Sequence, residues 1–174
     1  MKNKLFNTLI LTLYATLFSI NSHAQRPEKL DYFNKSFIGF LPSTNNSGNS
    51  FSKQRGTLIS TVNGIKINSN LAVGIGVGIG AYVNPTFTSI PVFLDGNYYL
   101  YKKNNSPYAY ADLGYSFSTA NFIKGGILLE AGLGWKFKIT DKFMLGPQVG
   151  YRNQSINKNT DHLGSISIGV TSTF

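Results

Sequence analysis

Charged side chains recur at alternating positions in the second half of the chain, inside segments that have the sequence pattern of β-strands. They are Asp95, Asp112, Glu130, Lys136, Lys138 and Arg152. Burying charges of this kind is costly unless acids and bases pair. Because opposite signs occur on neighbouring segments, we expect one internal ion-pair network that also includes Gln148 and tyrosines. Such a network could act as a polar plug or as a gated path for ions.

The remaining reactive groups are sparse. His162 stands beside Asp161 and near Ser155 and Ser165, and the chain has no cysteine. A lone histidine in a polar loop is usually only a loop residue, and zinc sites need several ligands. The alternating Gly74, Gly76, Gly78 and Gly80 open no helix and are not a phosphate loop. We therefore expect no catalytic site, no metal and no cofactor.

The elements that must position the charges have a period of two, which is the strand period. In the segment Leu71–Tyr82 one face is aliphatic: Leu71, Val73, Ile75, Val77, Ile79 and Ala81. The other face carries four glycines with Ala72 and Tyr82. Lipid suits the first face, and a narrow barrel interior suits the second.

The same alternation predicts five further strands: Thr88–Tyr101, Pro107–Ser118, Gly126–Ile139, Lys142–Gln154 and Ser165–Phe174. Phe33–Leu41 and Gln54–Val62 alternate more weakly and complete a set of eight. Strands of about ten to twelve residues can cross a bilayer at a tilt. Pro91 and Pro147 fall inside strands, where each removes a ladder hydrogen bond. We expect local bulges there, or strand boundaries shifted by a few residues.

An open sheet is excluded in lipid, because its edge N–H and C=O groups would stay unpaired. A soluble barrel needs a polar outer face, which neither Leu71–Ala81 nor Ile127–Ile139 supplies. The fold class we expect is all-β, an eight-stranded antiparallel up-and-down transmembrane β-barrel. Side chains fill the interior of a barrel of this size. We therefore favour the polar plug over the ion path.

The chain begins with the pattern of a secretory signal. Lys2 and Lys4 precede the apolar stretch Leu5–Ile20, and Ser22-His23-Ala24 offers a cleavage site. We expect residues 1–24 to be a cleaved signal peptide and residues 25–174 to be the barrel domain, with an uncleaved anchor helix as the alternative.

The net charge of +9 falls to +7 without Lys2 and Lys4. The lysines of the exported part fall mostly in turns and loops, which argues against nucleic acid. We expect outer-membrane lipids and lipopolysaccharide to be the partners of these basic side chains. The alternative is that the positive charge serves only to keep the protein soluble.

An even number of strands places both termini on one side of the membrane, which we expect to be the periplasm. The periplasmic turns would then be Asn63–Asn70, Lys102–Ser106 and Thr140–Asp141. The external loops would be Pro42–Ser52, Val83–Phe87, Thr119–Gly125 and Ser155–His162. These loops are short, so they offer little material for a receptor or a catalytic lid.

Four short motifs and the last residue carry a family resemblance. They are the glycine-alternating Leu71–Ala81, LGYSF at Leu113–Phe117, GLGWKF at Gly132–Phe137, GYR at Gly150–Arg152, and the terminal Phe174. Over residues 30–174 the chain resembles the OmpA/OmpX-like eight-stranded outer-membrane barrels of Gram-negative bacteria. The resemblance implies that Phe174, with Val170 and Ile168, is read by the barrel-assembly machinery.

This fold hosts porins, adhesins, enzymes and structural proteins. Our first hypothesis is a monomeric outer-membrane protein, not an enzyme, with a structural or surface-interaction role and a lumen plugged by polar side chains. The alternatives are a narrow channel for ions or small solutes and a lipid-A-modifying enzyme.

Overall fold

A computed structural model describes residues 31–44, 53–84, 86–101, 105–119, 125–156 and 161–174. The expected signal peptide and the expected mature N-terminus at Gln25 lie outside the described residues. The described part forms eight strands: β1 (Asp31–Pro42), β2 (Arg55–Lys66), β3 (Leu71–Val83), β4 (Phe87–Tyr99), β5 (Ser106–Ser118), β6 (Gly126–Lys138), β7 (Met144–Ile156) and β8 (Asp161–Thr173).

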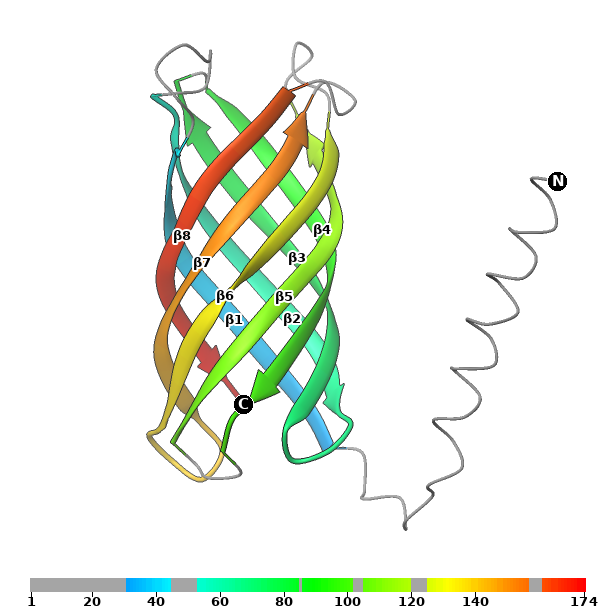
Figure 1. Cartoon of the computed structure of the whole chain (residues 1–174), viewed down its shortest axis with the longest axis vertical. Coiled ribbons are helices and arrows are strands. Elements are labelled where there is room, and N and C mark those ends of the chain that lie inside the picture. Colours follow the sequence, from blue (N-terminus) through cyan, green and yellow to red (C-terminus); the bar gives the residue numbers. More distant parts are fainter. Residues whose placement is uncertain (1–30, 45–52, 85, 102–104, 120–124, 157–160) are drawn as a thin grey trace, which may run out of the picture.

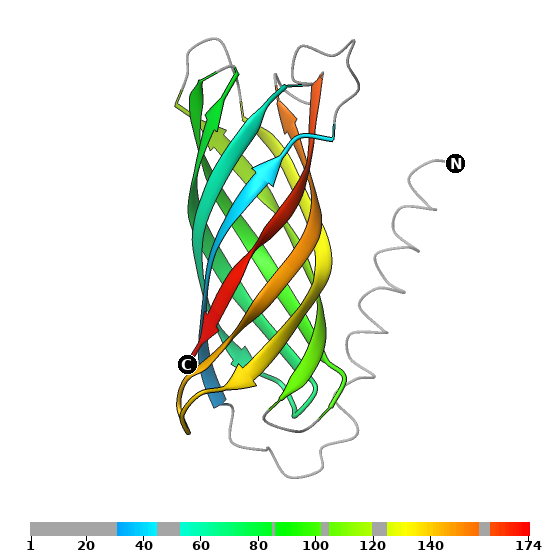
Figure 2. The same cartoon turned by 90° about the vertical axis from the view of Figure 1, so that its left-hand side faces the viewer.

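Each strand pairs antiparallel with the next, and β1 pairs with β8, so the sheet closes into a barrel (Figure 1). Asn34 and Phe174 complete this closure by exchanging two backbone hydrogen bonds. The start of β1 and the end of β8 lie at the same end of the barrel (Figure 2), here named the terminus end; the opposite end is the loop end. Within the described ranges, no helix is long and apolar enough to span a bilayer.

The predicted eight-stranded antiparallel barrel is confirmed, including the two weakly alternating strands at the start. β1 is longer than predicted at both ends, β2 continues to Lys66, and β8 begins already at Asp161, because cross-strand pairing continues where the sequence alternation fades.

The expected bulges at the two prolines were wrong. Pairing of β3 with β4 stops after Val77↔Val92 and resumes at Gly80↔Ser89 in the same register. Pro91 still pairs with Ser116 on its other side. Pro147 likewise interrupts pairing with β6 only, while its pairing with β8 continues. A proline removes one donor, and the unbroken ladder on the other side holds the register.

Inward glycines make room for aromatic rings that lie across the narrow interior. A Cβ added at Gly76 would lie 2.4 Å from the Phe93 ring, and one at Gly134 would lie 2.3 Å from Cζ of Tyr108. Both distances are far below van der Waals contact. The nearly bare face seen in the sequence is therefore filled by rings from neighbouring strands.

Large apolar side chains cover the outer surface of the barrel. Ile59, Ile75, Ile79, Leu94 and Leu133 are each 60–63% exposed. Outward aromatic residues near the terminus end include Trp135 and Phe137, whose rings stack with centroids 6.0 Å apart. A contiguous apolar surface of this extent suits the hydrocarbon of a bilayer, with aromatic rings near its boundary.

Candidate functional site

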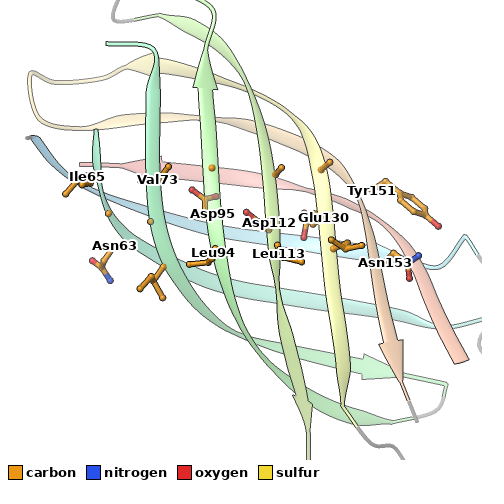
Figure 3. Close-up of a pocket in the computed structure, with 17 residues that line it drawn as sticks. Asn63, Ile65, Val73, Leu94, Asp95, Asp112, Leu113, Glu130, Tyr151 and Asn153 are labelled. Carbon is orange, nitrogen blue, oxygen red and sulfur yellow. The ribbon is translucent and has the colours of Figure 1, made fainter. Parts of the chain in front are cut away.

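Four ionisable side chains lie in one row across four adjacent strands of the interior. The register pairs Asp95 on β4 with Asp112 on β5, Asp112 with Glu130 on β6, and Glu130 with Arg152 on β7. Figure 3 shows the three carboxylate side chains next to one another on their strands. All four residues are buried. Four of the six charged members of the expected network are therefore neighbours.

Glu130 and Arg152 form the best-supported pair in this row. Nη1 of Arg152 lies 2.9 Å from Oε2 of Glu130. The other oxygen of Glu130, Oε1, accepts hydrogen bonds from the Tyr110 hydroxyl at 2.8 Å and from Ser167 Oγ at 2.6 Å. Both carboxylate oxygens therefore have donors, which is what a buried charge requires.

Lys35 on β1 completes the group, and the sequence interpretation missed it. Its Nζ pairs with Asp95 and donates to Oδ1 of Asn97 at 2.8 Å. The bond spans the barrel, because β1 and β4 are not neighbours. Lys35 lies between the inward Phe33 and Phe37, and that alternation was the signal available.

Asp112 lies between the two ion pairs and has the least support. Its Oδ1 has no hydrogen-bond partner among the described residues. Three carboxyl groups (Asp95, Asp112, Glu130) therefore face two cations (Lys35, Arg152). The space that they enclose has a volume of about 10 Å³. A cavity of this size holds one water molecule at most.

The two other predicted charges lie apart from this row. Nζ of Lys136 is 3.8 Å from the ring centroid of Tyr99, in the geometry of a cation–π contact. Nζ of Lys138 lies 2.6 Å from Oδ1 of Asp141, in the turn after β6. This hydrogen bond and the lysine charge lower the pKa of Asp141. Gln148 accepts a hydrogen bond from Tyr108 at 2.9 Å rather than from the charged row.

Buried apolar residues close the interior on both sides of the charges. Toward the loop end the layer consists of Phe37, Leu41, Leu58, Tyr82, Phe87, Ile156 and Leu163. Toward the terminus end lie Phe33, Ala72, Tyr99 and Tyr108, with the two tyrosine rings 5.6 Å apart. The charged residues therefore occupy a layer between two apolar layers.

A groove of about 930 Å³ follows the outside of the same strands (Figure 3). Its floor contains the register neighbours Gly96, Ala111 and Ala131, and larger side chains such as Leu94 and Leu113 border it. The small residues make the outer wall hollow there. Most of the lining is apolar, and its polar side chains besides the carboxylates of the interior are Asn63, Tyr151 and Asn153.

The residues considered for catalysis lie at the loop end, and Phe174 lies at the terminus end. Nδ1 of His162 is 3.3 Å from Oγ of Ser155. In the described part of the chain no cluster of three or more His, Cys, Asp or Glu residues could hold a metal. Phe174 is 59% exposed, and its ring centroid lies 5.1 Å from that of Phe143. Ile168 and Val170 face outward on the same strand.

A closed eight-stranded antiparallel barrel, with an apolar exterior and an interior filled by side chains, has the fold of the small outer-membrane β-barrel proteins. Several solved structures similar to this chain belong to that class. Neisserial surface protein A superposes with a TM-score of 0.64 at 17% identity, covering 84% of this chain and 98% of its own. The outer membrane protein OprG from Pseudomonas aeruginosa gives a TM-score of 0.52 at 11% identity, with coverages of 82% and 95%.

The outer membrane protein W of E. coli gives a TM-score of 0.50 at 11% identity, covering 86% of this chain and 99% of its own. No family model matches the sequence, and no curated protein matches it. The resemblance expected from the sequence is therefore confirmed at the level of the fold.

Proposed function

We propose that this protein is an outer-membrane barrel that acts through its outer surface and its loop end, with a lumen closed to solutes. The observation that carries this proposal is the layered interior. Paired charges fill the middle, and apolar side chains cover them toward both ends. An ion that crosses would have to leave water and break buried ion pairs, which costs several kcal/mol per ion.

The proposal includes the placement and the partners inferred from the sequence. Residues 1–24 direct export, both termini face the periplasm, and the barrel is a monomer among outer-membrane lipids and lipopolysaccharide. Phe174, with Val170 and Ile168, serves as the signal for the assembly machinery. The exposed outward position of these three side chains supports this role, because an assembly factor could reach them.

A narrow cation path is the second candidate, because three carboxyl groups against two cations leave the charged layer acidic. Measuring the conductance of the refolded barrel in a planar bilayer tests both the closed lumen and the cation path. The closed lumen predicts no steady conductance above that of the bare bilayer. It also predicts that Phe37→Ala, which thins the apolar layer at the loop end, conducts more than the wild type. Stable cation-selective openings of the wild-type barrel would support the path instead.

A further inference from the structure

A second site lies on the outer rim of the loop end, away from the charged lumen. It is a pocket of about 470 Å³ where β1 ends, β2 begins and β3 ends. Its lining includes Phe40, Pro42, Lys53, Arg55 and Asn84. Pro42 pairs with Arg55, and Arg55 pairs with Val83, so these strand ends are held by the barrel ladder.

The pocket is basic, and its cations are not neutralised by the described part of the chain. Lys53 and Arg55 are both exposed. The ion pairs among the described residues join Lys35, Lys138 and Arg152 to carboxylates and leave Lys53 and Arg55 without such a partner. Two neighbouring cations at the rim attract an anion.

Between the two outward cations lies Gln54, which belongs to the buried face of this strand end. Gln54 stands between the two cations in the sequence and is only 2% exposed. Neither its Nε2 nor its Oε1 has a hydrogen-bond partner among the described residues. Because Gln54 is buried while Lys53 and Arg55 are exposed, the side-chain chemistry that the pocket offers to an anion comes from the two cations.

The outer surface next to the pocket, on the side of the terminus end, is apolar. Phe40 is 46% exposed and Ile38 on the same strand is 59% exposed, and both belong to the outer apolar surface. Ile59 on the adjoining β2 is 61% exposed. A ligand seated here would hold its anionic part against Lys53 and Arg55 and its apolar part along these side chains.

We propose that this pocket binds the phosphate-bearing headgroup of a membrane lipid, whose acyl chains pack on Phe40, Ile38 and Ile59. The planar guanidinium of Arg55 can hold a phosphate with two hydrogen bonds, and Lys53 adds a point charge. The proposal rests on the proposed function, because it requires the barrel to sit in a membrane with its loop end at the headgroup level.

The test uses the full mature chain refolded into zwitterionic phosphatidylcholine nanodiscs that contain a few per cent of diphosphorylated lipid A. The barrel is then extracted with mild detergent, and the lipid A retained per barrel is measured by mass spectrometry. Each cation near a membrane surface contributes roughly 1 kcal/mol. The double variant Lys53→Gln/Arg55→Gln should therefore bind lipid A roughly 30-fold more weakly.

The matched control is Lys66→Gln/Lys142→Gln, which removes the same charge at the terminus end and should retain lipid A like the wild type. Equal retention by the rim variant and the wild type would overturn the site, as would equal loss in the control. Displacement of lipid A by millimolar inorganic phosphate would show an anion site without lipid selectivity and would also overturn it.

The migration of unboiled protein on a gel separates this result from the proposed function. A chain that never gives the compact folded band in nanodiscs contradicts the membrane barrel itself. A folded barrel that retains no lipid A contradicts only the rim site.

Discussion

Replacing Arg152 by methionine should destabilise the barrel strongly, because it leaves Glu130 charged and buried. Arg152 is 2% exposed and Glu130 is 5% exposed. Removing one partner of a buried pair costs about 3–5 kcal/mol. Arg152 uses only Nη1 in this pair, and its Nε and Nη2 have no hydrogen-bond partner among the described residues. We therefore expect the lower end of the range, about 3 kcal/mol.

The double variant Glu130→Gln/Arg152→Met provides the control. An amide at position 130 carries no charge, and its oxygen can still accept from Tyr110 and Ser167, which donate to Glu130 at 2.8 and 2.6 Å. The loss in the double variant should therefore be smaller than the sum of the two single losses by at least about 2 kcal/mol, which is the coupling between contacting residues.

Urea unfolding of the refolded protein in lipid vesicles measures these free energies, with Trp135, the only tryptophan, as the fluorescent probe. When the free energy of unfolding falls by about 2 kcal/mol per molar urea, a loss of about 3 kcal/mol in stability lowers the urea midpoint of unfolding by about 1.5 M. Single losses that simply add in the double variant would refute the reasoning, because the pair would then contribute nothing specific.

Three further expectations use the same assay or a folding yield. Val77→Lys should lower the free energy of unfolding by about 2–4 kcal/mol, because Val77 faces outward near the middle of β3 and lysine at the bilayer midplane is poorly tolerated. The control Val77→Ile should leave the stability unchanged. A Val77→Lys variant as stable as this control would contradict the outward assignment. Gly146→Ala should cost about 1–3 kcal/mol, since its Cβ would lie 1.5 Å from the carbonyl oxygen of Trp135, whereas Gly96→Ala, with 3.8 Å to its nearest neighbour, should not destabilise. Phe174→Ser should reduce folded protein in cells more than refolding in detergent, and equal reductions would indicate a purely structural role.

The sequence by itself determined the fold class. The alternation in Leu71–Tyr82 leaves one face aliphatic and the other nearly bare, and a strand with these two faces requires lipid outside and a narrow interior inside. The parity of each strand also determined which charges point inward. Asp95, Asp112, Glu130 and Arg152 are all buried as a result.

Only the tertiary structure decided which inward residues meet. Alternation specifies the face of a residue but not its height in the barrel, which depends on the register between strands. The register placed four charges in one row and left Lys136 against Tyr99 near the terminus end. The pairing of Lys35 with Asp95 depends on closure, because β1 and β4 approach each other only across the lumen of a closed barrel. The rim pocket has the same origin: Phe40, Arg55 and Asn84 belong to three strand ends that pairing brings together.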